Sequence, residues 1–407
     1  MIQAPRGTFD VLPDDAARRE VVESHARRIL GDAGYRRIET PAFEATELFA
    51  RGVGEATDIV QKEMYSFDDG SLTLRPEGTA PVCRAYLEHG MHKLPQPVKL
   101  WYLSSFFRHE TPQAGRYRQF WQVGAETIGT AEPAADAELI VLLAALLDAL
   151  GVRERRLRLS SLGNPETRAE YREELQRYLR AREDQLSAEV RARIELNPLR
   201  AFDSADPGTR AVMADAPLLL DRLAPEDAEH FHAVRALLDG AGVRYELDPT
   251  LVRGLDYYTR TVFEFASDAL GAQSGVGGGG RYDRLIELLD GRPTPGSGWA
   301  AGVERMLLAA GELPTAPALV DLFVAIAPGA DHRAAFGLST SARRAGLAAQ
   351  LELTGRSLKG QLKHADRLGA RYVAIVGDPT TLKEMESGDQ HEVGIEAIIP
   401  TILRGGR

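Results

Sequence analysis

The sequence has little cysteine, no long apolar run and no excess of positive charge. Its 407 residues include one cysteine, Cys83, which excludes an internal disulfide framework and a zinc site built from several thiolates. The longest apolar run, 139–150, is short and contains Asp148, so it predicts a buried helix and not a membrane span. The amino terminus lacks the apolar region of a secretory signal, and we therefore expect a cytoplasmic protein.

The formal net charge of −10 argues against a protein that coats nucleic acid without specificity. A specific nucleic-acid partner held by local basic patches is still compatible with it. The sequence also lacks a Walker A pattern. If the protein binds ATP, arginines on a sheet surface must therefore hold the phosphates.

The order of expected elements divides the chain into a discontinuous α+β domain, a helical insertion and a second domain. In 1–163, a helix at 14–31 precedes strands that do not alternate regularly with helices, which favours an antiparallel sheet. These strands are expected at 35–40, 64–67, 71–75, 98–107 and 117–128. Residues 164–242 are expected to form a helical insertion, with one or two exposed helices at 166–193, and the first domain resumes over 243–312.

The carboxy-terminal part of the chain predicts a small α/β domain at 319–407, after a linker at 313–318. Strands and helices alternate there, and Gly369 occupies a position typical of a helix C-cap. The expected strands are 319–327, 348–353 and 371–377, and the expected helices are 331–345 and 357–368.

The segment 251–265 combines a cation, two phenols and a run that predicts a strand. Arg253 could bind a carboxylate or phosphate through its planar guanidinium, and the tyrosines could line a polar pocket. A buried strand with core tyrosines and a surface arginine is the alternative. Because side chains alternate along a strand, we expect Tyr258 in the pocket and Tyr257 in a structural role.

Two expected strands flank a polar loop around Pro112 and Gly115. Strand alternation places Gln122, Gly124 and Glu126 on one face. Polar side chains on such a face usually contact solvent, but the arginines nearby would suit a triphosphate: Arg108, Arg116 and Arg118.

Three further segments have both a functional and a structural interpretation. The glycine run 275–280 formally matches a dinucleotide fingerprint, but we favour close approach of its backbone to a ligand or strand, with a flexible loop as the alternative. Glu77 and Thr79 offer an acid and a hydroxyl, or simply a capped helix start. Arg305 lies on a helix expected to begin near Trp299, where a lone arginine is usually solvated.

Taken together, these motifs resemble the histidyl-tRNA synthetase family of class II aminoacyl-tRNA synthetases over essentially the whole chain. The similar segments are 6–10 (an amino-terminal signature), the helix ending at Gly34 with Pro41 (motif 1), 107–126 (motif 2), 251–265 and 277–283 (two histidine motifs) and 298–308 (motif 3). The resemblance implies a class II antiparallel catalytic domain with a helical insertion and a carboxy-terminal α/β anticodon-binding domain.

The resemblance also implies a role for each site residue. Arg108 and Arg305 would bind ATP phosphates, and Arg253 would lie at the substrate carboxylate and the α-phosphate. Glu110 and Arg116 would lie along the ATP and the tRNA end. The remaining residues would bind histidine, three at its α-amino group (Glu77, Thr79, Gln122) and three at its imidazole (Glu126, Tyr258, Tyr282).

The implied reaction is a histidine–tRNA ligase reaction, with L-histidine, ATP, Mg²⁺ and tRNA(His) as partners of a homodimer and no membrane partner. Trp121 and Thr111 depart from the residues usual in motif 2, and 378–392 looks shortened relative to the family. A noncatalytic histidine sensor, like the regulatory subunit of ATP phosphoribosyltransferase, is the alternative. The presence of Arg108, Arg253 and Arg305 and of the carboxy-terminal domain favours the enzyme.

Overall fold

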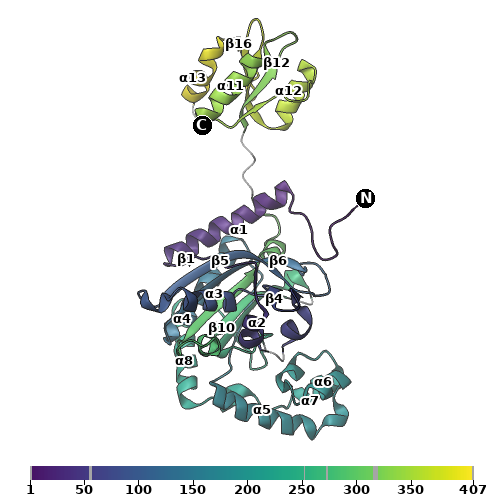
Figure 1. Ribbon diagram of the computed structural model, residues 1–407, viewed down its shortest axis with the longest axis vertical. Helices are drawn as coiled ribbons and strands as arrows, with labels where there is room; N and C mark the ends of the chain where they lie inside the picture. The colour runs from purple at the N-terminus through teal and green to yellow at the C-terminus, as the bar shows by residue number, and fades with distance from the viewer. Residues whose placement is uncertain (1, 55–56, 252, 272–273, 315–319, 406–407) are drawn as a thin grey trace. The chain divides into compact units, whose positions relative to one another are not determined.

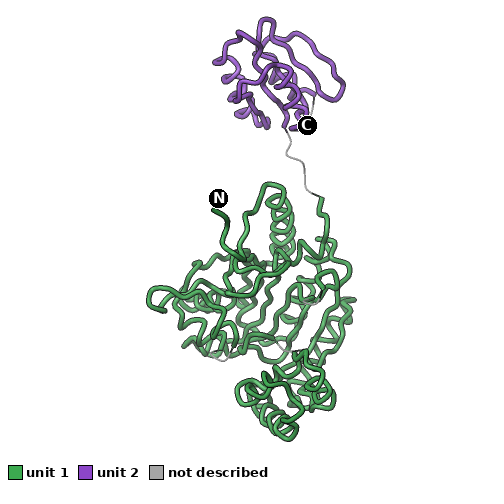
Figure 2. Tube along the Cα trace, turned by 90° about the vertical axis from the view of Figure 1, so that its right-hand side faces the viewer, with its two compact units in different colours: residues 1–314 green, residues 315–407 purple. Residues whose placement is uncertain are grey.

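The computed structural model describes residues 2–54, 57–251, 253–271, 274–314 and 320–405 and divides into two compact units (Figures 1 and 2). Unit 1 is Met1–Pro314 and unit 2 is Thr315–Arg407. Residues 315–319, which include most of the expected linker and the first residue of the expected strand 319–327, lie outside the described residues, as does Val252. Among the helices described, none has the length and apolar character that crossing a membrane requires.

A sheet of eight strands forms the centre of the described part of unit 1, in the order β1-β5-β6-β11-β10-β9-β7-β8. Its inner neighbours are antiparallel, and only the outer pairs β1–β5 and β7–β8 are parallel. The strands are β1 (Arg36–Arg37), β5 (Val98–Phe107), β6 (Gln119–Ile128), β7 (Arg156–Ser161), β8 (Glu246–Leu247), β9 (Thr259–Ala266), β10 (Gly275–Arg281) and β11 (Gly296–Gly302). The expected antiparallel sheet is confirmed.

Helices pack on both faces of this sheet (Figure 1). One face is covered by α1 (Pro13–Asp32), α4 (Pro133–Ala149), α8 (Pro225–Gly240) and α10 (Val303–Ala310). The other face carries α3 (Thr79–Glu88) and α9 (Leu285–Leu288). Strand alternation assigns Trp101 to the first face and Tyr102 to the second. The site residues of β6, Gln122 and Glu126, face the second side, because Val123 and Ala125 between them pack on the first.

A small sheet stands beside this second face, with strand order β2-β4-β3. Its strands are β2 (Phe43–Ala45), β3 (Tyr65–Phe67) and β4 (Leu72–Leu74), and α2 (Thr46–Val53) follows β2. The chain passes from β4 directly into the turn that begins α3, which brings Glu77 and Thr79 to the main sheet.

The segment expected as a helical insertion contains two kinds of helix. The helices α5 (Pro165–Arg180), α6 (Ala188–Arg193) and α7 (Pro207–Met213) form a lobe at one end of unit 1 (Figure 1). One or two helices were expected at 166–193, and the structure has two there, α5 and α6. In contrast, α8 buries Phe231, Val234 and Leu238 in the same apolar cluster as α4. We use the name helical lobe for residues 165–222 alone.

Unit 2 is an α/β domain built on a sheet with strand order β13-β12-β14-β15-β16. The first three strands are parallel and the last two are antiparallel. Its elements are β12 (Val320–Ile326), α11 (His332–Arg344), β13 (Ala349–Leu351), α12 (Leu358–Arg367), β14 (Ala370–Val376), β15 (Thr381–Glu384), β16 (Gln390–Glu392) and α13 (Ile398–Arg404). The expected alternation is confirmed, and Gly369 has the left-handed φ of +64° that a C-cap glycine adopts.

Two boundaries differ from the sequence-based expectation. Trp299 was expected to begin a helix, but it lies within β11, which pairs with β6 on one side and β10 on the other. Because its backbone hydrogen bonds are made to these two strands, β11 continues to Gly302 and the helix begins only at Val303. The strand expected at 35–40 is reduced to two residues, because only Arg36 and Arg37 pair with β5.

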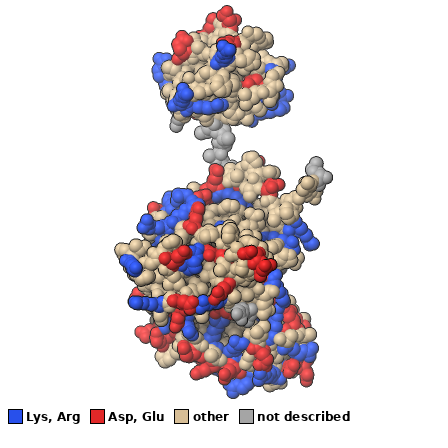
Figure 3. All heavy atoms as spheres, in the orientation of Figure 1, with Lys and Arg blue, Asp and Glu red and all other residues tan. Residues whose placement is uncertain are grey.

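Acidic and basic side chains are intermixed over unit 1 on the face shown in Figure 3. Many of them form ion pairs at the surface, such as Arg222 with Glu174 and Arg180 with Glu195. The net negative charge is therefore compatible with local basic sites.

Candidate active site

Small residues of β6, β10 and β11 form the floor of the site, because functional side chains lie directly across them. A Cβ on Gly298 would be 1.7 Å from Glu126 Oε2, and one on Gly280 would be 3.0 Å from Tyr258 Cδ1. The glycine run 275–280 is most of strand β10 and pairs with strands on both sides. Close approach of its backbone is therefore confirmed, and the flexible-loop alternative is wrong.

A fully buried carboxyl group, Glu126, closes one end of the site. Glu126 is 0% exposed and accepts hydrogen bonds from Thr79 Oγ1 at 2.8 Å and Tyr282 Oη at 2.7 Å. Burial raises the pKa of Glu126 to about 8. The hydrogen bonds from Tyr282 and Thr79 oppose this rise, and a cationic group beside Glu126 would lower its pKa further.

Glu77 lies next to this group and caps helix α3. Its carboxylate accepts the backbone N–H groups of Thr79 at 2.7 Å and Ala80 at 2.9 Å. Burial raises the pKa of Glu77, and these two backbone donors oppose the rise. The capped-helix interpretation is confirmed. Glu77 Oε2, the oxygen that accepts the Thr79 N–H, also lies 3.5 Å from the Tyr257 hydroxyl.

An open cavity of about 630 Å³ has more basic than acidic side chains in its lining, and its Arg108 donates to Pro76, the residue before the buried Glu77. It is bordered by Gln122, by six arginines (Arg108, Arg116, Arg158, Arg200, Arg253, Arg305) and by four acidic residues (Glu110, Asp203, Glu264, Glu304). Such a lining suits a polyanion that also presents polar groups.

Each of the three arginines assigned to catalysis is fixed by a defined contact. Arg108 donates from Nε to Pro76 O at 2.8 Å and lies over the Phe120 ring. Arg253 donates from Nη1 to Glu264 Oε2 at 2.5 Å. The Arg305 Nε group donates to a backbone carbonyl of β10, and burial lowers the pKa of this guanidinium. The charges are therefore preorganised around the cavity.

Three buried polar atoms on the cavity wall have no hydrogen-bond partner in the described part of the chain, and one of them, Glu110 Oε2, forms an ion pair with Arg116. The other two are Gln122 Oε1, an acceptor, and Arg253 Nε, a donor. A buried group without a partner costs about 1–3 kcal/mol, so a ligand or water that bonds these atoms gains binding energy. The two atoms offer opposite polarity to that ligand.

The loop before β9 corrects one sequence-based expectation. The strand expected within 251–265 begins only at Thr259, and residues 251 and 253–258 are neither helix nor strand. Alternation therefore does not apply to Tyr257 and Tyr258, whose rings lie 4.7 Å apart and are both buried. Tyr257 contacts the acidic cluster, and both tyrosines border a second cavity of about 390 Å³ toward the helical lobe.

The structure places the sequence-derived residues in two adjoining groups. Arg108, Glu110, Arg116, Gln122, Arg253 and Arg305 border the open cavity. Glu77, Thr79, Glu126 and Tyr282 form the buried cluster, with Tyr258 against the Tyr257 ring.

Sequence reasoning did not identify Tyr102 or Glu264. Tyr102 pairs with Gly124 and lies 3.5 Å from Glu126. Gly124, whose lack of a side chain leaves room for the Tyr102 ring, is the one signal of this contact in the sequence. The signal could not be used, because the sequence does not show that β5 and β6 pair Tyr102 with Gly124. Glu264 alternates with apolar residues along β9, a pattern that looks like an ordinary solvent face.

Comparison with known proteins identifies the family. A model of histidyl-tRNA synthetase matches residues 7–306. The chain belongs to the histidyl-tRNA synthetase family. An anticodon binding domain model matches residues 323–404, which lie in unit 2.

Relatives of the histidyl-tRNA synthetase family extend over the whole chain. The histidine–tRNA ligase of Desulforudis audaxviator is 49% identical and covers 100% of both chains, and that of Rubrobacter xylanophilus is 48% identical and covers 96% of both. The crystal structure of apo S. aureus histidyl-tRNA synthetase is 36% identical, with a TM-score of 0.81, and covers 99% of this chain and 100% of the other. The class II α+β fold with a carboxy-terminal anticodon-binding domain is thereby established.

Proposed function

We propose that this protein activates L-histidine with ATP to histidyl-adenylate and then transfers the histidyl group to tRNA(His). The observation that carries the proposal is the adjacency of a cavity lined by arginines to a buried cluster of acids and phenols. The first suits a triphosphate and the second suits a small amino acid with an N–H donor ring.

In the activation step, a carboxylate oxygen of histidine attacks the α-phosphorus of ATP as the bond to pyrophosphate breaks. Such in-line transfer requires positioning and charge neutralisation more than covalent catalysis. We assign Arg253 to the reacting carboxylate and α-phosphate, and Arg108 and Arg305 to the ATP phosphates. Their fixed contacts keep the positive charges in place before the charge on the phosphate redistributes.

For histidine, we assign the α-amino group to Glu77, Thr79 and Gln122, whose Oε1 lacks a partner in the described structure. We assign the imidazole to Glu126, Tyr258 and Tyr282. An amino acid whose side chain cannot bond Glu126 would leave a buried acid without its partner. Such sites discriminate by roughly 10⁴–10⁵, so a separate editing domain is unnecessary.

ATP is the expected co-substrate of this family, and we propose Mg²⁺ as its counter-ion. The described residues contain no cluster of three or more histidine, cysteine or acidic side chains that could form a protein-only metal site. However, Glu110 and Glu264 border the cavity, and Mg²⁺ commonly binds through one or two carboxylates together with substrate phosphates. When bound, the ion would neutralise phosphate charge, and these two carboxylates would hold it.

For tRNA, we propose that unit 2 binds the anticodon and that Glu110 and Arg116 lie near the acceptor end and the ATP. Glu110 forms ion pairs with Arg116 and with Arg108, the latter at 3.7 Å, so the three side chains form one group at the cavity mouth. The division at 163, 242 and 312, the homodimer and a cytoplasmic location stay predictions.

The test is histidine-dependent ATP–pyrophosphate exchange by the purified chain and by Arg253→Ala. We expect the variant to lose on the order of 10²–10³ in rate while its fold survives. The matched control is Arg156→Ala on β7, which removes an exposed ion pair between Arg156 and Asp268 and should retain the rate. If the wild-type chain binds histidine and exchanges nothing with Mg²⁺ present, the histidine sensor replaces the enzyme.

A further inference from the structure

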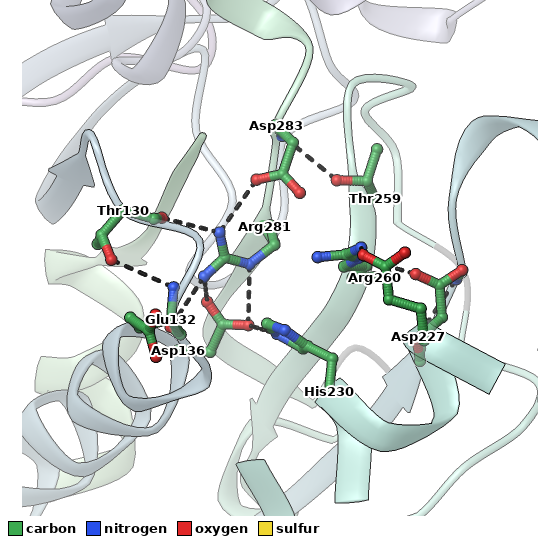
Figure 4. A network of polar contacts seen from close by, with 12 residues as sticks. Thr130, Glu132, Asp136, Asp227, His230, Thr259, Arg260, Arg281 and Asp283 are labelled. Carbon is green, nitrogen blue, oxygen red and sulfur yellow. Dashed lines mark hydrogen bonds and ion pairs between the residues drawn. The ribbon is translucent and has the colours of Figure 1, made fainter. Parts of the chain in front are cut away.

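A buried ionic network surrounds Arg281, the residue that precedes Tyr282 of the proposed histidine pocket (Figure 4). At its centre Arg281 is 0% exposed. Its guanidinium donates to Asp136 through Nη2 at 2.7 Å and Nε at 3.2 Å, and to Asp283 through Nη1 at 3.0 Å. The backbone carbonyls of Thr130 and Glu132 accept the remaining donors. All five N–H groups are thus used, which fixes the orientation of the guanidinium.

His230 extends this network to helix α8. Its Nε2 lies 2.9 Å from Asp136 Oδ2, the same oxygen that Arg281 Nε approaches. Both His230 and Asp136 are almost completely buried, at 7% and 2% exposure. Because an isolated buried charge is costly, the position of Arg281 depends on the carboxylate that His230 orients.

The network is joined to the pocket through a single peptide bond. Arg281 is the last residue of β10, and the next residue, Tyr282, donates its hydroxyl hydrogen to Glu126 at 2.7 Å. The strand register shifts between Gly280 and Arg281, so the β9–β10 ladder does not by itself fix this corner. On the other side of β10, Arg281 pairs with Ser297 of β11, and the Tyr282 N–H donates to Gly296 O at 2.7 Å. The Arg281 side chain and β11 therefore together hold the backbone that carries the Tyr282 phenol.

A second contact connects α8 with the other tyrosine loop. Arg260, two residues after Tyr258, has an unusual positive φ of +46° for a residue with a side chain. Its guanidinium donates to Asp227 at 2.8 Å and to Glu226 at 2.5 Å, both in the first turn of α8. Asp227 also accepts the backbone N–H of Asn164, where the helical lobe begins. Thus α8 contacts the segment of Tyr258 directly, through Arg260, and is linked to that of Tyr282 through Asp136.

We propose that Asp136 on α4, Arg281 on β10 and His230 on α8 are positioning residues for histidine recognition, which together hold Tyr282 against Glu126. The inference rests on the proposed function for the identity of the ligand. None of the three side chains borders the open cavity, so each acts through Tyr282 and touches no substrate in this account. A loss of the network should weaken binding of histidine and leave binding of ATP nearly unchanged.

The test measures the Kd of L-histidine by calorimetry and the KM values of histidine and ATP in exchange, using the full chain. We expect His230→Leu to raise the Kd and the KM of histidine about tenfold, because a small misplacement of a pocket group is costly. His230→Gln, whose amide can still donate to Asp136, should restore most of the affinity. Asp136→Asn should resemble His230→Leu. The control His232→Leu changes an exposed histidine of the same helix and should alter neither constant.

The readouts separate this inference from a purely structural role and from the proposed function. Unchanged histidine constants in His230→Leu, with only a lower melting temperature or active fraction, would overturn it. An equal rise in the KM values of histidine and ATP would also overturn the inference. Should the wild-type chain bind histidine without exchange, the proposed function fails, while the calorimetric comparison of the variants still decides the inference.

Discussion

The buried acid Glu126 provides a prediction whose size follows from the structure. Its pKa is about 8 in the fold, against 4.5 for the ordinary group. The folded state therefore binds the proton more tightly than the unfolded chain. Relative to Glu126→Gln, the wild type is most stable below pH 4.5 and loses that advantage as the pH rises to about 8. At about 1.36 kcal/mol per pH unit, the relative loss between pH 5 and pH 9 is at most roughly 4 kcal/mol.

Urea unfolding at each pH, followed by tryptophan fluorescence, measures this difference. The three tryptophans, Trp101, Trp121 and Trp299, all belong to unit 1, so the signal reports on the unit that contains Glu126. The control Glu166→Gln changes an exposed carboxyl group and should shift stability by less than about 0.5 kcal/mol throughout. A difference between wild type and Glu126→Gln that stays constant from pH 5 to pH 9, or grows in favour of the wild type, would refute the reasoning.

Two further changes to the chain test the floor of the site and the assignment of amino-acid activation to unit 1 and tRNA binding to unit 2. Gly298→Ala should lower the stability of the fold and raise the KM of histidine at least about tenfold, because the new Cβ would lie 1.7 Å from Glu126 Oε2. Thermal unfolding measures the first effect and enzyme kinetics the second. Gly240→Ala, which adds a methyl group to open space at the end of α8, is the matched control and should preserve both. Deleting 319–407 should abolish tRNA charging and spare ATP–pyrophosphate exchange; equal loss of both would contradict the domain assignment.

The sequence predicted the elements whose signals are local. The strands at 98–107 and 117–128 and the helices at 14–31 and 357–368 were found within a few residues, because their apolar periodicity and glycine endings reflect burial and capping. Both the open cavity and the acidic cluster contain residues that motif order had already singled out.

The errors arose where tertiary contacts override a local pattern. The phenols of 257–258 lie in a loop held by packing against α3 and β10, which no alternation rule can describe. Trp299 belongs to a strand because partners on both sides use its backbone hydrogen bonds. The network of Asp136 and His230 joins positions 94 residues apart, and only the packing of α8 on α4 brings them together.

The central claim is tested most directly by ATP–pyrophosphate exchange of the 407-residue chain, measured separately with each of the twenty amino acids. The account predicts rapid exchange with histidine and rates lower by roughly 10⁴ or more with amino acids that cannot bond Glu126. Histidine binding without exchange, or faster exchange with another amino acid, would contradict it.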